Sequence, residues 1–527
     1  MFFRPIIILI ILAVIFGGVY FWLVAPVKTQ ADLTLRFDWP DETANYFWIK
    51  NFVEGKGLAV FEPLNLVAQN QIHPRSFNVR PDGSLVPGSF LGLILYYGFL
   101  AKIFGVKLII YLTPLLAIFG VLAIYGILRR FFGEKVALIS AILLLIQPAW
   151  WYYSVTSLLP NVPFVSLILL SVYFAVKKEK LKIDNLIFTG VFAGLALAIR
   201  PAEIIWVSLI YLAIFIYLRK SLSLLKLSIF FSLIFLIILP VFYQQQILYG
   251  GFLVSGYSQL QNLNSADCQS CTLVKSLFLP FGFHPALAVY NFWTHFVSRF
   301  WVWSLLAILG LIAYLVQSKH QKNEIFSYLM VSLFIFGWII IYYGSWQFSD
   351  LLTIHLNILG LSYVRYFLPL YILALPFVAF GLIWLVSFFK NQFQIFGLIV
   401  FIILLGYFSA KLVLVEKVDS LLPVKNRILT YHHLAASVNE ITPENSVIVT
   451  IRKDKVFFPE RKVIHTFDSL SASEEILEIL PALAKVAPVY YYALGPEEKL
   501  EFDNGFKLEE IKSFGAERLY EIKINNP

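Results

Sequence analysis

The stretch PIIILIILAVIFGGVYFWLVA, residues 5–25, decides the fold class, because it carries no charged side chain. A helix of about 20 apolar residues is long enough to cross the hydrocarbon core of a bilayer. A secretory signal peptide has a shorter apolar core of roughly 7 to 15 residues, so we expect this segment to remain as an uncleaved anchor. The segment therefore predicts an integral membrane protein.

Apolar segments of similar length recur along the chain. Of the 527 residues, 59% are hydrophobic and only 14% are charged, and a water-soluble core could not bury so much apolar surface. We predict a polytopic α-helical membrane protein with about eleven transmembrane helices. The predicted spans are residues 5–25, 108–128, 136–156, 162–176, 185–200, 202–218, 227–247, 299–316, 325–343, 365–388 and 392–413.

The distribution of Lys and Arg predicts the orientation. If the N-terminus is cytoplasmic, every short basic connection also falls inside, as the positive-inside rule requires. These connections are residues 129–135, 177–182, 219–226, 319–322 and 390. We therefore expect a multi-pass protein of the plasma (inner) membrane with its active site and polar C-terminal segment outside. The net charge of +9 follows from these loops, and no basic patch interleaved with aromatic residues indicates a nucleic-acid partner.

The first outside loop, residues 26–87, contains the acidic turn FDWPDET at residues 37–43. The loop is far longer than the usual connection of about 4 to 6 residues, which indicates a functional segment. We predict that Asp38 caps a short amphipathic helix whose first turn contains Pro40. The next apolar run, residues 88–104, is short for a span and is predicted as an interfacial or re-entrant helix.

Ionisable residues next to apolar runs are predicted to gather at the outer membrane face. They are Asp41, Glu42, Lys102, Arg200, Glu203, Arg299 and Arg365. Such charges are expensive to bury and indicate a functional site. Structural explanations remain open, since Arg200 and Glu203 are spaced to form an ion pair and Arg365 resembles a snorkelling anchor. For Asp41 and Glu42, the N-terminus of a helix is a sufficient explanation.

Carboxylates beside arginines at a lipid boundary suit group transfer from a membrane-anchored phosphate donor. Arginine binds phosphate oxygens in a bidentate manner and can stabilise the charge on a departing phosphate. A carboxylate can accept the proton of an acceptor hydroxyl. Asp41 and Glu42 point about 100° apart on a helix, so only one of them is expected to be the base.

Several short motifs follow one another in an order that carries a resemblance. They are Pro40-Asp41-Glu42 with Tyr46 and Gly55-Lys56-Gly57, Pro87 to Gly105, Arg129 to Gly133, Gly190 to Pro201, and Arg365-Tyr366-Phe367-Leu368-Pro369. This order resembles the GT-C superfamily of polyprenyl-phosphate-dependent glycosyltransferases, in particular the protein O-mannosyltransferases and lipid A aminoarabinose transferases. The resemblance covers most of residues 1–413. It implies many helices around an outer cavity and an inverting transfer of a sugar from a lipid phosphate.

The resemblance also implies roles for individual residues. Asp41 is the expected base, and Glu42 is expected to cap the helix or to orient a substrate or ion. The expected substrate-binding residues are Arg200, Arg365, Tyr366, Lys102, Arg80 and His355. The expected partners are a polyprenyl-phosphate-linked monosaccharide, a protein, lipid or glycan acceptor, and the bilayer. No cofactor is assigned, and a divalent metal stays open because no metal motif of the family is matched.

Residues 1–413 are thus predicted to form a transmembrane glycosyltransferase domain with a catalytic outside loop at residues 26–107. Residues 414–527 are predicted to form a small outside α/β appendage, with strands at 446–451 and 489–493 on either side of a helix. Cys268 and Cys271 lie in an outside loop, where a disulfide is favoured over free thiols.

Two other classes of protein remain open from the residues alone. One is a transporter or flippase of lipid-linked saccharides, although charges near the middle of the membrane would then be expected. The other is a non-catalytic membrane protein that binds cell-surface polymers. Turnover of the donor separates both from an enzyme.

Overall fold

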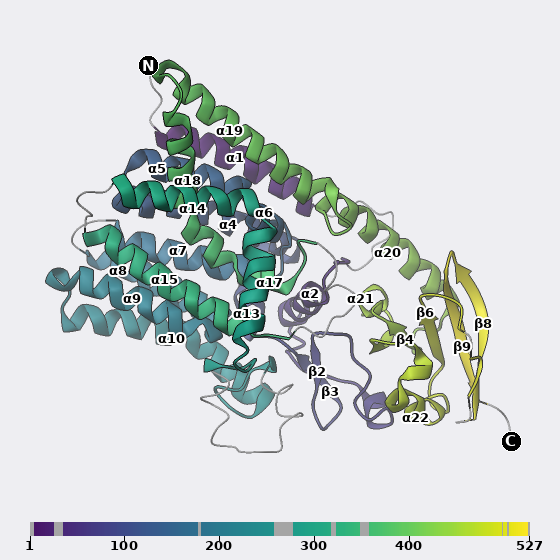
Figure 1. Ribbon diagram of the computed structural model, residues 1–527. Coiled ribbons are helices and arrows are strands. Elements are labelled where there is room, and N and C mark those ends of the chain that lie inside the picture. Colours follow the sequence, from purple (N-terminus) through teal and green to yellow (C-terminus); the bar gives the residue numbers. More distant parts are fainter. Residues whose placement is uncertain are drawn as a thin grey trace. The chain divides into compact units, whose positions relative to one another are not determined.

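The computed structural model describes residues 5–25, 35–177, 181–257, 278–317, 323–347, 358–497, 499–502 and 505–524. Two compact units divide the chain (Figure 1). Unit 1 comprises Met1–Ala25, Ile110–Pro240 and Asp267–Pro423, and unit 2 comprises Pro26–Ile109, Val241–Ala266 and Val424–Pro527. Each unit is therefore assembled from segments that are far apart in the sequence.

Helices, most of them apolar, form unit 1, because a helix satisfies its backbone hydrogen bonds within one segment and can therefore lie in lipid. They are α1 (Pro5–Val24), α4 (Ile109–Phe132), α5 (Glu134–Ile146), α6 (Pro148–Val155), α7 (Asn161–Val176), α8 (Ile183–Ile199), α9 (Ile204–Tyr217), α10 (Leu224–Tyr249), α13 (Pro285–Phe292), α14 (Trp301–Gln317), α15 (Asn323–Gly344), α17 (Ser362–Tyr366), α18 (Leu368–Ser387) and α19 (Asn391–Lys411). Further short segments of unit 1 are η3 (Pro201–Glu203), η4 (Arg219–Ser221), η5 (Trp293–Ser298) and η6 (Leu412–Glu416), whereas η2 (Val106–Leu108) belongs to unit 2.

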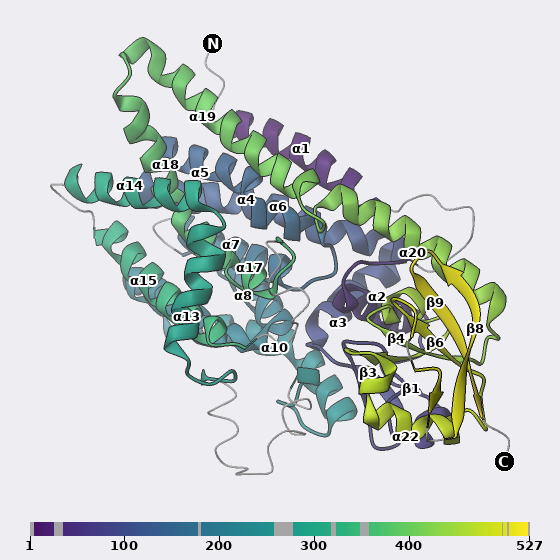
Figure 2. The ribbon, with the colours of Figure 1, turned by 45° about the vertical axis from the view of Figure 1, so that its right-hand side comes forward.

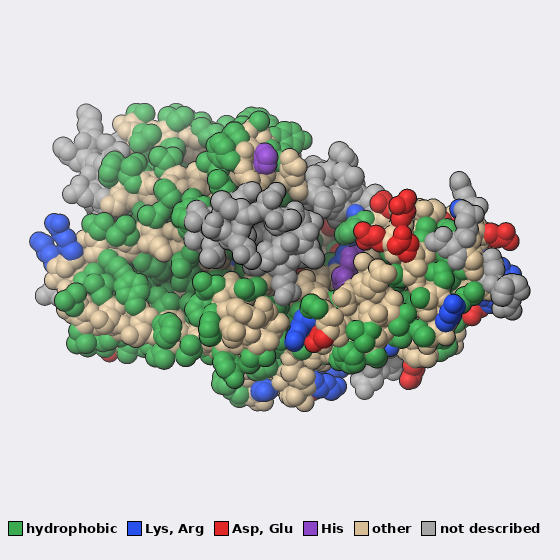
Figure 3. Space-filling model, turned by 90° about the horizontal axis from the view of Figure 1, so that it is seen from below, with side chains coloured by type: hydrophobic (Ala, Val, Ile, Leu, Met, Phe, Trp, Pro, Cys, Tyr) green, Lys and Arg blue, Asp and Glu red, His purple; other side chains and the backbone are tan. Residues whose placement is uncertain are grey.

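Hydrophobic side chains cover much of the surface of these helices (Figure 3). In the most apolar windows of α10 and of the helix that begins with α19, only 11% and 17% of the residues are buried. Apolar surface of this extent needs lipid rather than water around it. The chain is accordingly a multi-pass integral membrane protein.

Fewer helices are long enough to span a bilayer than the eleven we predicted. Among the described residues, six helices meet the length and apolarity of a span, or up to nine if each bent pair counts as one. Helices α7, α8 and α9 have only 16, 17 and 14 residues. At 1.5 Å per residue they reach about 21 to 26 Å, which is less than a hydrocarbon core of about 30 Å.

Residues 35–109, which include most of the predicted outside loop, fold into part of unit 2. Helix α2 (Pro40–Val53) packs against α3 (Leu91–Phe104), and a small antiparallel sheet has the strand order β1 (Val60–Phe61), β3 (Ser84–Pro87) and β2 (Phe77–Val79). A short helix, η1 (Pro63–Leu66), follows β1. With 14 residues, α3 is too short to span a bilayer, in agreement with the prediction.

The predicted capping role of Asp38 is wrong. Trp39 occupies the N-cap position of α2, and its side chain makes no capping hydrogen bond. Pro40 fills the first helical position, where its missing N–H and fixed φ angle are tolerated. Asp38 precedes the helix and binds side chains of the C-terminal segment instead.

The C-terminal part of unit 2 contains α20 (Leu421–Ile441) and a six-stranded sheet in the order β5-β4-β6-β9-β8-β7. Strands β4 (Val447–Ile451), β5 (Lys462–Thr466) and β6 (Val489–Ala493) are parallel, and α21 (Asp454–Phe457) and α22 (Glu474–Leu483) lie in the connections between them. The predicted strands at 446–451 and 489–493 and the helix between them are therefore confirmed, but β5 and α21, which also lie between these strands, were not predicted. The antiparallel strands β7 (Glu501–Phe502), β8 (Phe506–Phe514) and β9 (Glu517–Ile524) were not predicted either. Figure 2 shows β8 and β9 side by side.

The first loop and the C-terminal sheet share one hydrophobic core. Ala68 and Ile72 of the loop are buried in the same cluster as Val447, Val449 and Leu480 of the sheet and its helices. A parallel bridge between His73 and Ile464 continues the sheet into the loop. The predicted catalytic loop is thus part of the same compact unit as the C-terminal segment.

Ile72 provides a test of this shared core. Its side chain is 2% exposed, so Ile72→Asp places an unpaired charge in the core and should lower the free energy of unfolding by at least about 3 kcal/mol. Leu66, in the same loop, is 62% exposed, and Leu66→Asp should change stability by less than about 0.5 kcal/mol. Thermal unfolding of the purified protein measures both, and equal effects would contradict the shared core.

Candidate active site

The acidic turn gives its two carboxylates different surroundings. Asp41 and Glu42 both lie in the first turn of α2. Asp41 is half-buried, and its Oδ1 accepts a hydrogen bond from the Ser76 hydroxyl at 2.5 Å. Glu42 is only 5% exposed. Adjacent helical positions point about 100° apart, so Asp41 is the more accessible of the two carboxylates.

Asp38 anchors the start of this turn. Its carboxylate accepts hydrogen bonds from Arg427 Nε at 2.9 Å and Nη2 at 2.6 Å. Lys455 Nζ lies 3.5 Å from Oδ1 and also donates to the backbone oxygen of Asp38. Burial alone would raise the pKa of Asp38, but the two cations outweigh this and lower the pKa to about 2.

A second buried ion pair lies next to Ser76. Asp454 is completely buried and accepts hydrogen bonds from the backbone N–H of Arg75 at 2.8 Å and from its Nε and Nη2 at 2.9 and 2.7 Å. Burial favours the neutral carboxyl, but Arg75 outweighs it and lowers the pKa of Asp454 to about 2. Asp454 therefore stays ionised at physiological pH.

In unit 1, the helical structure is interrupted at Arg200, and the side chain of this residue is buried. Helix α8 ends at Ile199 because Pro201 disfavours helical geometry at Arg200, whose φ and ψ are −139° and 78°. The guanidinium of Arg200 donates to Glu203 Oε1 from Nε at 3.0 Å and from Nη2 at 2.7 Å, and Nη2 also donates to the hydroxyl of Tyr343 at 2.8 Å. The predicted structural ion pair is therefore present.

A second arginine converges on the same place. The guanidinium carbons of Arg200 and Arg365 lie 5.1 and 5.2 Å from the centre of the Tyr366 ring. Tyr366 stacks on Tyr343 with ring centres 4.3 Å apart, and Trp346 lies 5.7 Å from Tyr366. Two cations and an aromatic wall are thus brought together from segments that lie more than 140 residues apart in the sequence. This arrangement is suited to an anion that carries a sugar ring.

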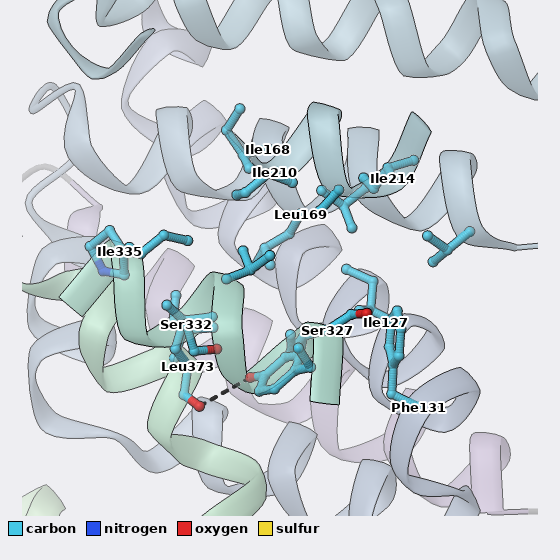
Figure 4. Close-up of a pocket in the computed structure, with 18 of the residues that line it drawn as sticks. Ile127, Phe131, Ile168, Leu169, Ile210, Ile214, Ser327, Ser332, Ile335 and Leu373 are labelled. Atoms are coloured by element: carbon cyan, nitrogen blue, oxygen red, sulfur yellow. Dashed lines mark hydrogen bonds between the residues drawn. The ribbon is translucent and has the colours of Figure 1, made fainter. Parts of the chain in front are cut away.

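An apolar cavity of about 150 Å³ lies among α4, α7, α9, α15 and α18. Its lining is almost entirely hydrophobic, with Ile127, Phe131, Leu169, Ile210 and Ile335 among the residues drawn in Figure 4. Trp206 also lines the cavity, and its indole N–H donates to Glu203 Oε2 at 2.6 Å. The cavity is therefore linked directly to the Arg200 ion pair.

The other predicted substrate-binding residues belong to unit 2 or fall outside the described residues. Lys102 Nζ sits 4.2 Å above the ring of Phe52, near the end of α2 opposite to Asp41. Arg80 follows β2 at the end away from Ser76 and lies 3.4 Å from Asp82. His355, Cys268 and Cys271 fall outside the described residues, so the predicted disulfide is not placed. Within the described ranges, no group of three His, Cys, Asp or Glu residues could hold a metal ion.

Sequence reasoning missed Ser76, Tyr343 and Trp206, and it gave no role to Asp454. Tyr343 and Trp206 resemble the many aromatic residues of an interfacial belt, so composition does not single them out. The Ser76–Asp41 contact joins residues that are 35 positions apart, and no local pattern indicates it.

Solved structures share the fold. The chain is similar to ArnT of Cupriavidus metallidurans bound to undecaprenyl phosphate, with a TM-score of 0.59 and 10% identity over 98% of this chain and 97% of that one. For ArnT in the apo state, the TM-score is 0.53 and the sequence identity is 11%, over 97% of both chains. The chain is also similar to the Archaeoglobus fulgidus oligosaccharyltransferase tethered to an acceptor peptide with the NVT sequon. The TM-score is 0.52 and the sequence identity is 12%, over 92% of this chain and 69% of that one.

A sequence match adds to this likeness of fold. Residues 93–243 match the protein-family model described as dolichyl-phosphate-mannose-protein mannosyltransferase. No curated protein sequence matches the chain. The chain therefore shares the fold of ArnT and of the oligosaccharyltransferase, and the matched segment agrees with the resemblance seen in the motifs.

The lowered pKa of Asp454 predicts how stability changes with pH. In the unfolded chain this carboxyl titrates near its ordinary value of 3.8, whereas in the folded protein it titrates at about 2. The ion pair therefore stabilises the protein fully above pH about 4, and this contribution is lost as the pH falls towards 2.

Comparison with Asp454→Asn isolates this contribution. The variant leaves Arg75 without its charged partner and should cost about 3 to 5 kcal/mol of unfolding free energy at neutral pH. The difference from the parent should shrink below pH about 4. Thermal unfolding of both proteins between pH 7 and pH 2.5 measures it, and a constant difference over this range would contradict the assignment.

Proposed function

We propose that this enzyme transfers a monosaccharide from a polyprenyl-phosphate donor to a hydroxyl or amide group of a protein, lipid or glycan, with inversion at the sugar carbon. The convergence of Arg200 and Arg365 on Tyr366, beside an apolar cavity, carries this proposal. A polyprenyl phosphate combines a charged head group with an apolar chain, so it needs cations next to an apolar surface. The structure of ArnT with undecaprenyl phosphate, which shares the fold, supports the same class of donor.

The two arginines suit the phosphate end of the donor. Guanidinium groups remain charged when they are partly buried and bind phosphate oxygens in a planar, bidentate manner. Glu203 and Tyr343 hold Arg200 in one orientation, so little reorganisation is needed when charge develops on the phosphate. Tyr366, which contacts both guanidinium groups, is assigned to the same substrate.

Asp41 is assigned as the proton acceptor. The acceptor oxygen or nitrogen attacks the anomeric carbon of the sugar while Asp41 takes its proton. The bond from that carbon to the phosphate oxygen breaks, and its electron pair leaves with the phosphate, where Arg200 and Arg365 stabilise the charge. Attack from the face opposite the leaving phosphate inverts the configuration.

The remaining predicted residues have different assignments. Glu42 is buried next to Asp41 and is assigned to orient a substrate or ion. Arg80 and Lys102 have other partners, Asp82 and the ring of Phe52, so neither is given a part in the transfer step. The basic connections of unit 1 support an outward-facing site, because Lys and Arg favour the cytoplasmic side.

Turnover by purified protein in liposomes tests the roles of the residues. With a panel of polyprenyl-phosphate sugars and acceptors, Asp41→Asn should lower kcat at least about 100-fold, because the carboxylate base is lost. Arg200→Lys keeps the charge but loses the bidentate geometry, and should lower kcat/KM about 10-fold or more. Arg365→Ala should lower kcat/KM in the same way.

Arg219→Ala is the matched control, because Arg219 is an exposed arginine at the other end of α9 from Arg200. Its turnover should equal that of the parent. Donor consumption by Asp41→Asn at the parent rate would contradict the role of Asp41, and turnover by none of the proteins with any donor would contradict the proposed reaction.

Accessibility labelling tests the orientation. In a background with Cys268 and Cys271 replaced by Ser, cysteines at Phe61 and Val486, which are 57% and 55% exposed, should react with a membrane-impermeant maleimide from outside intact cells. A cysteine at Arg219 should react only after the membrane is opened. The reverse pattern would place the proposed site on the cytoplasmic side.

A further inference from the structure

We propose that Asp454 and Lys455, two adjacent residues of the C-terminal segment, position the carboxylate of Asp41. Both belong to the first turn of α21, and neither touches Asp41 itself in the contacts described for them. They act through Ser76 on one side and Asp38 on the other. The inference rests on the proposed role of Asp41 as the proton acceptor.

Asp454 fixes the main chain next to Ser76. A carboxylate that bound only the guanidinium of Arg75 would hold a flexible side chain, but Asp454 also accepts the backbone N–H of Arg75 at 2.8 Å. Arg75 Nη2 in turn donates to the backbone oxygen of Arg452 at 2.8 Å, so the arginine is held from two sides. Because Asp454 is completely buried, this contact excludes water.

Ser76 has a backbone conformation that needs such support. Its φ is +66°, which is in the left-handed region that residues other than glycine rarely adopt. Strained residues of this kind persist only where their surroundings hold them. On one side Asp454 holds Arg75, and on the other side Gly88 N–H donates to the Ser76 oxygen at 3.1 Å. A Cβ at Gly88 would come within 2.7 Å of that oxygen, so only glycine permits the approach.

This conformation places the Ser76 hydroxyl against the proposed base. The hydroxyl lies 2.5 Å from Asp41 Oδ1 and donates a hydrogen bond to it, so it fixes the position of that oxygen. A proton acceptor has to lie within hydrogen-bonding reach of the proton that it takes. An error of about 1 Å in its position can cost as much as 100-fold in rate.

Lys455 fixes the other side of Asp41. Its Nζ donates to the backbone oxygen of Asp38, three residues before Asp41, and lies 3.5 Å from the Asp38 carboxylate. Arg427 holds the same carboxylate in a bidentate contact. Asp454 therefore binds the cation Arg75, which precedes Ser76. Lys455 binds the anion Asp38, which precedes Asp41. The two adjacent residues thus hold two different segments of the first loop.

The test compares kcat and the donor KM of the full-length protein in liposomes. Asp454→Asn and Ser76→Ala should each lower kcat about 10- to 100-fold while the donor KM changes less than about threefold, because the base is displaced and the donor site is intact. Ser76→Gly relieves the backbone conformation but also removes the hydroxyl, and should be equally slow. In Ser76→Ala the acidic limb of the pH–rate profile should move to higher pH, since the carboxylate loses a donor.

Glu62→Gln is the matched control. Glu62 forms an ion pair with Lys462 at 2.9 Å, which also ties the first loop to the C-terminal sheet, but it contacts neither Asp38, Arg75 nor Ser76. Its kcat should equal that of the parent. If Glu62→Gln is as slow as Asp454→Asn, docking of the two segments in general explains the effect and the positioning role is overturned.

Asp41→Asn separates the two proposals. If it is inactive while Asp454→Asn and Ser76→Ala keep the parent kcat, the positioning role is overturned and the proposed function stands. If Asp41→Asn keeps the parent turnover, the proposed role of Asp41 is overturned together with this inference. If Asp454→Asn fails to fold, Ser76→Ala and Ser76→Gly decide. A double variant, Asp454→Asn with Ser76→Ala, should be no slower than the slower single variant if both act through one contact.

Discussion

The buried ion pair between Arg75 and Asp454 is the interaction on which unit 2 depends. A fully buried carboxylate is stable only when its hydrogen bonds and its charge are satisfied, and Asp454 obtains both from one residue of the first loop. The loop cannot leave the sheet without exposing this pair and the apolar side chains of Ala68 and Ile72. A long loop that follows a membrane helix thereby becomes an ordered part of a domain.

Unit 1 also contains a buried charge, which lies between apolar helices. Arg200 interrupts two apolar helices, and a charge at such a place is costly unless partners surround it. Glu203, Tyr343 and the ring of Tyr366 supply those partners. The structural ion pair and the proposed phosphate contact are therefore compatible, because the pair orients the guanidinium while Arg365 adds a second cation beside it.

The chain shares the fold of ArnT, and residues 93–243 match a mannosyltransferase family model. Its own residues show how the proposed site is held. The carboxylate proposed as the base stands in a helix whose start is held by residues from the far end of the chain. Asp38 and Arg427 are 389 residues apart, and Arg75 and Asp454 are 379 apart. The C-terminal segment is thus bound to the turn that carries the proposed chemistry, rather than being a separate appendage.

The sequence alone determined the features that depend on local physics. Apolar runs predicted membrane helices, Pro40 predicted the start of α2, and Pro201 marked the break after α8, because helix formation and transfer into lipid depend on neighbouring residues. The tertiary structure decided the partners of each charge. Asp38 was expected to cap a helix and instead binds Arg427 and Lys455, and the contacts of Asp41 with Ser76 and of Arg200 with Tyr343 were not expected. Such contacts join distant residues, and only the packing of the whole unit selects one partner among many.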